Sequence, residues 1–296
     1  IVKRKILKDR IDCLNKKITL KGEVKGKISN LKGRKLDLIT DDGTIFKGNI
    51  NISGLPDVEN MFMHINVDQL ITSKKQLEQL PLFPFCDEHK LKLTSNFNHL
   101  GKVYFKGNLT GFYYDFVAYG KFNTAIGSIS TDVSLKTINN EVKYKGEIES
   151  NHFHLGKFFE IPDEVGEITM NVDVDGSGTD LEKLKIKLNG KVEHIVVKDY
   201  EYNNVKVKGD LANKIFKGFL AVADENIDFD FDGFVDFREK LPIFNFVSNI
   251  NYAKLQQLNL IKLEKDLNTQ LSTQLTVNLV GNHIDNIEGD ILFKDL

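Results

Sequence analysis

The stretch Phe105-Lys106-Gly107-Asn108-Leu109 is one copy of a phrase that recurs along the whole chain: apolar, Lys, Gly, any residue, apolar. Further copies span residues 20–24, 24–28, 46–50, 144–148, 207–211 and 216–220, with looser ones at 188–192, 231–235 and 287–291. In a β-strand the first, third and fifth residues share one face, so the Gly falls on the apolar face and the Lys on the polar one. Because a strand bends easily at glycine, the phrase predicts a sheet curled along its length, with its apolar face inside.

Alternation of apolar and polar residues dominates the rest of the chain. Apolar side chains occupy every second position in the stretches 129–136, 167–174, 184–188 and 227–237, apart from Thr131 and Gly233. Such runs are typical of strands with one buried and one solvated face, and these strands belong to antiparallel sheets. We therefore predict an all-β fold, a long curled antiparallel sheet that forms a groove with an apolar interior.

Turn residues and weak helical signals complete the organisation. Turns are expected at residues 41–43, 139–140, 175–178 and 203–204. One to three short helices are expected, within residues 72–80, 155–159 and 253–260. Ordinary strand lengths give about twenty strands, whereas open twisted sheets rarely exceed ~10 strands without curling. We therefore expect residues 1–296 to form a single continuous β-groove segment, with no internal boundary.

Bulk composition narrows the class of partner. The net charge is −2 and no basic cluster with interleaved aromatic residues occurs, so nucleic acid is not an expected partner. The basic stretch 3–10 is interpreted as a solvated strand or loop end. Cys13 and Cys86 have no disulfide-framework or zinc spacing, and whether they pair stays open. No apolar run reaches the ~18 residues of a membrane span, and no signal peptide opens the chain. We expect a segment of a longer chain, with any anchor outside it.

The chain carries none of the common catalytic or nucleotide-binding motifs. His152 and His154 have the spacing of two ligands on one strand face, but no Cys or acidic cluster accompanies them, so a metal site is disfavoured. The Asp228, Asp230 and Asp232 ladder has oxygen ligands for calcium, but it is better explained as the wet face of a strand. We expect no catalytic residue, no metal and no cofactor.

A series of phrases, in order along the chain, resembles the TamB (translocation and assembly module) family of the AsmA-like superfamily, in its Bacteroidetes form. They lie at residues 53–60, 107–112, 115–121, 127–132, 153–157, 229–233 and 255–260. The resemblance covers most of the 296 residues, as an internal segment. It implies a non-enzymatic protein of the periplasm, anchored in the inner membrane by parts of the parent chain outside this segment.

The resemblance also implies a function. Proteins of this family form a β-groove linked to phospholipid transport between the inner and outer membranes and to outer-membrane biogenesis. They are also linked to outer-membrane protein assembly and secretion, with an Omp85-type barrel as partner. The implied partners are therefore phospholipid acyl chains, an Omp85-type barrel and the inner membrane. The alternative within the same resemblance is a scaffold or chaperone for outer-membrane proteins. A third reading, an extracellular β-rich adhesin, needs no inner-membrane anchor in the parent chain.

The candidate site is the apolar face itself. The residues alone do not distinguish an open groove from a closed sandwich core, and the resemblance favours the groove. The phrase glycines are expected to leave room there for an acyl chain. The candidate lining residues are Phe46, Ile50, Ile52, Val103, Phe105, Leu109, Val133, Leu135, Val142, Tyr144, Ile148, Ile168, Met170, Val172, Val174, Ile186, Leu188, Val205, Val207, Phe216, Leu220, Ile227, Phe229, Phe231, Val235, Phe237, Phe244, Phe246, Leu275, Val277 and Leu279.

Overall fold

The computed structural model describes residues 17–57, 59–79, 92–139, 141–258, 269–281 and 286–294. Cys13, Cys86 and the basic stretch 3–10 lie outside these residues. The chain divides into two compact units, Ile1–Val142 and Lys143–Leu296. The same type of strand builds both units, and the expected single segment without an internal boundary stays a prediction.

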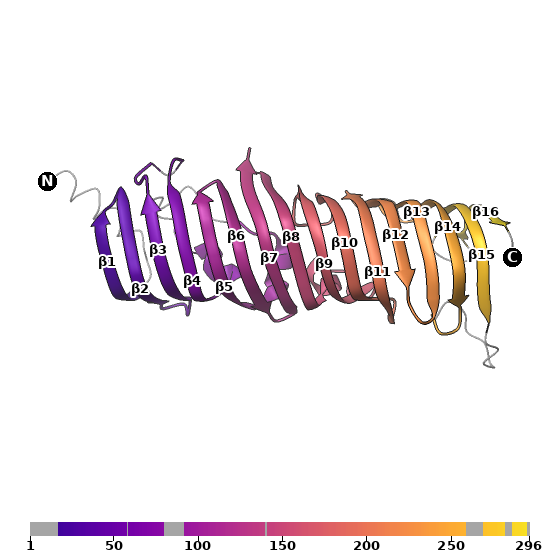
Figure 1. The fold of residues 1–296 in the computed structure, drawn as a ribbon, viewed down its shortest axis with the longest axis horizontal. Coiled ribbons are helices and arrows are strands. Elements are labelled where there is room, and N and C mark those ends of the chain that lie inside the picture. Colours follow the sequence, from indigo (N-terminus) through magenta and orange to yellow (C-terminus); the bar gives the residue numbers. More distant parts are fainter. Residues whose placement is uncertain are drawn as a thin grey trace. The chain divides into compact units, whose positions relative to one another are not determined.

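The first unit is an antiparallel meander. Its strands pair in chain order, each with the next, so consecutive strands are joined as hairpins or by short connections (Figure 1). They are β1 (Ile18–Lys27), β2 (Asn30–Thr40), β3 (Ile45–Ser53), β4 (Phe62–Ser73), β5 (Lys102–Phe112), β6 (Asp115–Thr124) and β7 (Gly127–Ile138). Two short helices, α2 (Lys74–Gln79) and the 3₁₀-helix η1 (Ser95–Leu100), belong to the β4–β5 connection.

The second unit repeats this plan. Its strands again pair with their neighbours in the chain, all antiparallel. They are β8 (Glu141–His154), which begins just before the division, β9 (Val165–Ser177), β10 (Lys185–Val197), β11 (Tyr200–Ala212), β12 (Ile215–Ala223), β13 (Ile227–Asp236), β14 (Ile243–Lys254), β15 (Gln270–Val280) and β16 (Glu288–Lys294). The helix α3 (Leu155–Phe159) connects β8 to β9.

The predicted fold class is confirmed. The described residues form sixteen antiparallel strands that do not close into a barrel, and three short helices. The expected helix after residue 72 is α2, and its Gln76 backbone N–H lies 3.4 Å from the Ser73 hydroxyl, as an N-terminal cap requires. Residues 155–159 form α3, whereas Ala253 and Lys254 end β14 and residues 255–258 form turns.

Two predicted turns are wrong. Residues 175–177 belong to β9, where Gly176 pairs with Tyr144 and Ile186, and the chain leaves the sheet only after them. Asn203 and Asn204 lie inside β11, and the turn before β11 is instead made by Lys198 and Asp199, both with positive φ. Asn204 also has a positive φ of 53°. The Asn signal for left-handed backbone was therefore misread as a chain reversal, whereas it marks an irregularity within the strand.

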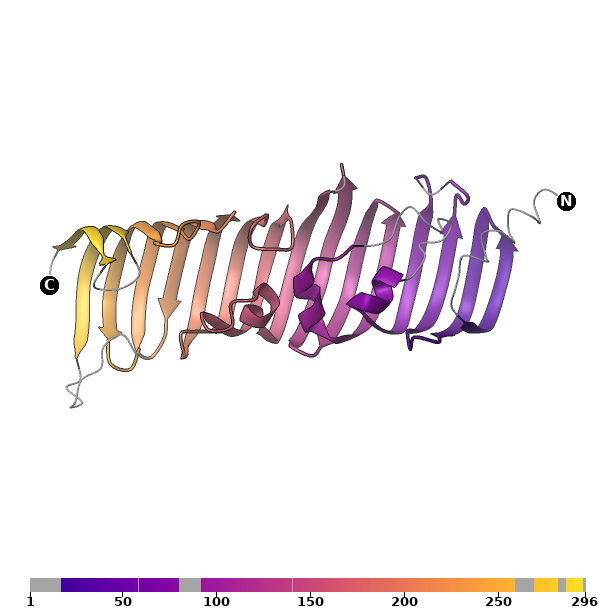
Figure 2. The same cartoon turned by 180° about the vertical axis from the view of Figure 1, so that it is seen from behind.

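Helices lie against one face of the sheet, as the reverse view shows (Figure 2). In the second unit, the Phe158 ring of α3 lies 5.7 Å from the Phe153 ring of β8, measured between centroids. Phe153 pairs with Ile168 on the face that carries the apolar residues of β9. The helix α3 therefore covers the end of the apolar face and leaves the middle of the strands without a second layer.

Candidate functional site

Pairing registers connect the apolar residues of the first unit into continuous rows that run across its strands. One row begins at Leu38 and Phe46, and another contains Ile50 and Val133. The first row consists of Leu20, Leu38, Phe46, Leu70, Phe105, Phe122 and Ile129, and the second of Val24, Gly33, Ile50, Ile65, Leu109, Ala118 and Val133. Because paired residues share a face of the sheet, each row is a strip of one apolar surface.

The second unit has rows of the same kind. The longest ones cross every strand from β8 to β16. One consists of Ile148, Val172, Gly190, Val207, Leu220, Phe231, Ser248, Leu275 and Phe293, and its neighbour of Gly146, Val174, Leu188, Gly209, Gly218, Gly233, Phe246, Val277 and Ile291. The strands are thus aligned so that apolar residues face apolar residues over the whole width of the unit.

The structure places every candidate lining residue on this apolar face of its own unit, or two residues beyond one that is. Sequence reasoning missed other members, among them Leu38, Leu70, Phe122, Val192 and Val222. Only the pairing register brings these residues into the rows, although each occupies an apolar position of an alternating strand.

Burial across the candidate residues is incomplete. The buried ones are Phe105, Val133, Ile168, Val172, Val174, Val205, Ile227, Phe231 and Val277. Val142 and Phe237 are exposed, by 43% and 53%. All the others are half-buried. In a closed sandwich the inward face would pack against a second sheet, so half-burial of most of these side chains is the signature of a face left open.

The phrase glycines are positions of close approach between strands. A Cβ atom added to Gly107 would lie 2.1 Å from the carbonyl oxygen of Tyr119, and one added to Gly209 would lie 2.6 Å from that of Lys217. Glycine also faces glycine across the strands, as in the pair Gly107 and Gly120. The neighbouring backbone therefore occupies the space that a side chain would need.

Phenylalanine rings cover the same glycines. The Phe105 ring would touch a Cβ added to Gly107 at 2.8 Å and one added to Gly120 at 2.6 Å. Phe105 also stacks on Phe122, with 4.4 Å between ring centroids. The expectation that these glycines keep room for an acyl chain is therefore wrong, because an aromatic ring and the adjacent strand fill that room. The apolar surface consists of the rings instead.

Hydroxyl groups on the apolar face are bonded to the sheet. The Ser150 hydroxyl donates to the carbonyl of Ile168 over 3.0 Å, and the Ser248 hydroxyl donates to that of Asp230. The Thr273 hydroxyl donates to two carbonyls, of Gln274 and Lys294. A hydroxyl that has already found an acceptor competes less for a ligand, so these groups do not interrupt the apolar surface chemically.

The opposite face carries charges in register. Lys145, Asp175, Lys187, Asp210 and Lys217 are paired one after another across β8 to β12, so cations and anions alternate. The Lys145 Nζ atom lies 2.9 Å from an Asp175 carboxylate oxygen. This hydrogen bond, together with the charge of Asp175, raises the pKa of Lys145. The pair is solvent-exposed, so it contributes little stability.

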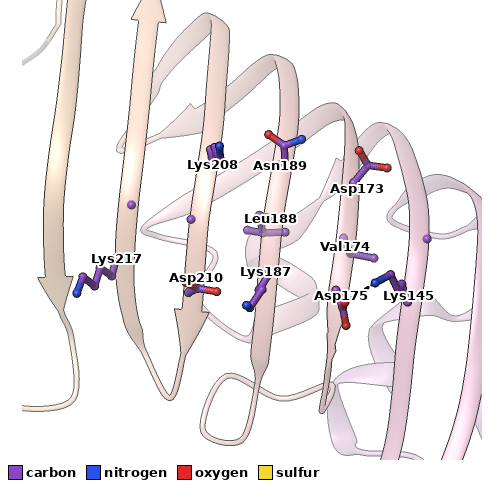
Figure 3. A pocket seen from close by; sticks show the side chains of 13 residues that line it. Lys145, Asp173, Val174, Asp175, Lys187, Leu188, Asn189, Lys208, Asp210 and Lys217 are labelled. Carbon is purple, nitrogen blue, oxygen red and sulfur yellow. Dashed lines mark hydrogen bonds and ion pairs between the residues drawn. The ribbon is translucent and has the colours of Figure 1, made fainter.

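A trough of about 710 Å³ lies on this polar face, within the second unit (Figure 3). Its two sides are the charged row just described and a second row that contains Asp173, Asn189 and Lys208. Backbone of the row between them forms the floor, at Gly146, Val174, Leu188, Gly209 and Gly218. The polar residues of the repeated phrase thus gather in one place, which their spacing in the sequence did not indicate.

One buried carboxylate fixes the β12–β13 turn. Asp224 is 4% exposed and accepts hydrogen bonds from the Tyr200 hydroxyl and from the backbone and side-chain N–H groups of Asn203. Burial alone would raise the pKa of Asp224, but the hydrogen bonds from Tyr200, Asn226 and Asn203 outweigh it and lower the pKa. Burial and the bond to Asp224 raise the pKa of Tyr200 to about 12. Because each group has its partners, the cluster is structural.

Histidine chemistry does not converge on a metal. The His152 ring lies 5.0 Å from the His194 ring, and its Nδ1 atom lies 3.4 Å from a Glu167 carboxylate oxygen. His154 points elsewhere and accepts the backbone N–H of Lys157. Among the described residues, no group of three or more His, Cys, Asp or Glu side chains is placed to hold a metal ion. The Asp228 and Asp230 carboxylates accept hydrogen bonds from Asn251 and Asn249 on β14.

Within the described residues, no helix is both long and apolar enough to span a membrane. Comparison of the chain with models of protein families, with curated proteins and with solved structures finds no match.

Proposed function

We propose that this chain is a non-enzymatic segment of a lipid-conducting groove, in which the apolar face carries phospholipid acyl chains. The observation that supports the proposal is the half-exposure of the apolar rows in both units. Soluble proteins rarely leave large contiguous apolar surfaces open unless a ligand, a membrane or a protein partner covers them. Lipid tails are the ligand class that matches a surface extending over so many strands.

The chemistry of the face suits a sliding acyl chain. Each methylene group transferred from water to an apolar surface contributes about 0.8 kcal/mol, so a tail gains from every row that it contacts. Phe, Ile, Val and Leu side chains supply this gain evenly, and the hydroxyls of Ser150, Ser248 and Thr273 are bonded to the sheet. A headgroup stays hydrated at the open side. The tail therefore meets no single deep binding site that would hold it.

The cellular setting of the proposal rests on the resemblance to the TamB family. On that basis the segment works in the periplasm, in a parent chain anchored to the inner membrane, and an Omp85-type barrel of the outer membrane is its protein partner. The groove would then carry phospholipid between the two membranes during outer-membrane biogenesis.

Lipid content of the purified chain tests the proposal. We expect mass spectrometry to find co-purified phospholipid, and we expect the double variant Val207→Asp with Leu220→Asp to lose it. Both residues lie half-buried in one apolar row, and a charge there removes the dry path. The control is Lys208→Asp, next to Val207 on the polar face. A folded native chain without lipid, or equal loss in the control, would contradict the proposal.

Exposed sheet edges favour a second candidate function, a scaffold or chaperone for outer-membrane proteins. Every residue of β1 and of β16 is exposed, and an exposed edge strand accepts a further strand by main-chain hydrogen bonding. Purified chain that carries no lipid but binds an unfolded barrel protein would support the scaffold over the groove.

A further inference from the structure

The two outermost strands, β1 and β16, have complementary sequences on their polar faces. Lys21, Lys25 and Lys27 project from that face of β1, interrupted by Glu23, and Glu288 and Asp290 project from that face of β16. In the described part of the chain, each of these strands pairs on one side only, β1 with β2 and β16 with β15. One edge is therefore mainly basic and the other contains two adjacent acidic positions.

We propose that β16 of one molecule pairs antiparallel with β1 of a second copy of this chain, head to tail. Each edge strand contains the glycine phrase, at residues 20–28 in β1 and its flank and at 287–291 in β16. Within both units glycines of neighbouring phrases face each other, as Gly107 faces Gly120 and Gly209 faces Gly218. The same rule applied between molecules leaves two registers, with Gly289 opposite Gly26 or opposite Gly22.

Charge selects the first register. With Gly289 opposite Gly26, Asp290 faces Lys25 and Glu288 faces Lys27, which are two favourable pairs. With Gly289 opposite Gly22, Glu288 would face Glu23, and like charges directly opposite are destabilising. The selected register has one like-charge pair, Lys294 with Lys21, at the end of β16, where the ladder contributes least.

Apolar side chains match in the same register. Ile291 falls opposite Val24, and Phe293 falls opposite Gly22, just as Phe246 lies opposite Gly233 inside the second unit. The exposed fractions of Val24, Ile291 and Phe293 are 50%, 42% and 50%, so the pairing covers apolar surface that is open in the single molecule. The apolar rows would then continue from one copy into the next.

A head-to-tail contact of this kind does not close on itself, so it adds copies one after another. A single strand pair lies at the small end of specific interfaces, so we expect weak association that grows with protein concentration. The proposal is independent of the lipid-groove function, because it depends only on the two edge strands.

Disulfide trapping between singly substituted chains tests the register. In a full-length background with Cys13→Ser and Cys86→Ser, a mixture of the Lys27→Cys and Glu288→Cys chains is expected to form a covalent heterodimer under mild oxidation, because facing residues in a sheet satisfy disulfide distances. The matched control is Glu23→Cys mixed with Glu288→Cys, which represents the other register and is expected to remain unbridged. Equal bridging of both mixtures, or no bridging of either, overturns the proposal.

Sedimentation velocity tests the charges without cross-links. We expect the average mass to rise with concentration, and Asp290→Lys to weaken association about fivefold to tenfold by replacing attraction with repulsion opposite Lys25. Adding Lys25→Asp to the same chain restores association. A chain that stays monomeric at every concentration, a double variant no stronger than Asp290→Lys alone, or bridging of Glu288→Cys only to itself or to an added unfolded barrel protein overturns the proposal.

Discussion

Glycine at the centre of the repeated phrase sets how closely neighbouring strands lie. The ring of Phe105 covers Gly107 and Gly120, and the backbone of Tyr119 lies where a Gly107 side chain would be. The sequence indicated that the glycine sits on the apolar face. It did not indicate what fills the space above it, because the ring that does so is placed by rotamer and strand register, which a single strand does not determine.

Replacement of Gly107 by alanine is expected to destabilise the protein by about 2–3 kcal/mol or more, because the added methyl group meets backbone that cannot move aside. Urea unfolding followed by circular dichroism measures the change. Lys106→Ala, one residue away on the polar face, is the control and is expected to change stability by less than about 0.5 kcal/mol. Equal stability of the Gly107→Ala variant and the native protein would contradict the close-approach explanation.

Asp224 makes stability depend on pH. Its pKa is lowered in the folded protein from the ordinary value of 3.8, so the folded state favours the ionised carboxylate. The resulting stabilisation is present above the unfolded pKa and is lost as the pH falls through the folded pKa. The stability difference between the native protein and Asp224→Asn is therefore expected to shrink when unfolding is measured at pH 3 instead of pH 7. A difference that is independent of pH would show that ionisation of Asp224 plays no part.

Strands are the scale at which the sequence was most informative. Alternation predicted which side chains of each strand share a face, and the candidate lining residues from Phe46 to Leu279 lie on the apolar face accordingly. Turn positions were less predictable, since Gly176 and Asn204 carry turn-type residues inside β9 and β11. A strand with a local irregularity and a strand that ends use the same residue types, and only the partner strand distinguishes them.

Two phenylalanines at successive sites of β13 and its exit should differ in their effect on stability. Phe231 is 8% exposed and lies 4.8 Å from the Phe246 ring, whereas Phe237 is 53% exposed. Phe231→Ala is expected to cost about 3 kcal/mol of unfolding free energy, and Phe237→Ala less than about 1 kcal/mol. Chemical unfolding of both variants measures this difference. Similar losses for the two would mean that the apolar face is packed evenly, as in a closed core.

At the scale of the whole molecule, an apolar face that extends across the strands of each unit is half-exposed, while the opposite face is charged and wet. The residues alone left a groove and a sandwich core unresolved, because both need the same alternation. The difference lies in what covers the apolar side chains, and that depends on how the strands are arranged in space. Neither the resemblance nor the spacing of the phrase indicated that their Lys and Gly residues assemble the trough between Lys145 and Lys217.

Photo-crosslinking in cells tests the central claim most directly. A photoreactive amino acid is placed at Val207, on the apolar face, or at its neighbour Lys208, on the charged face, and captured phospholipid is measured after irradiation. The groove predicts strong labelling from position 207 and background labelling from position 208, because only the apolar face contacts acyl chains. Equal labelling from both positions, or none from either in folded protein, would contradict the account.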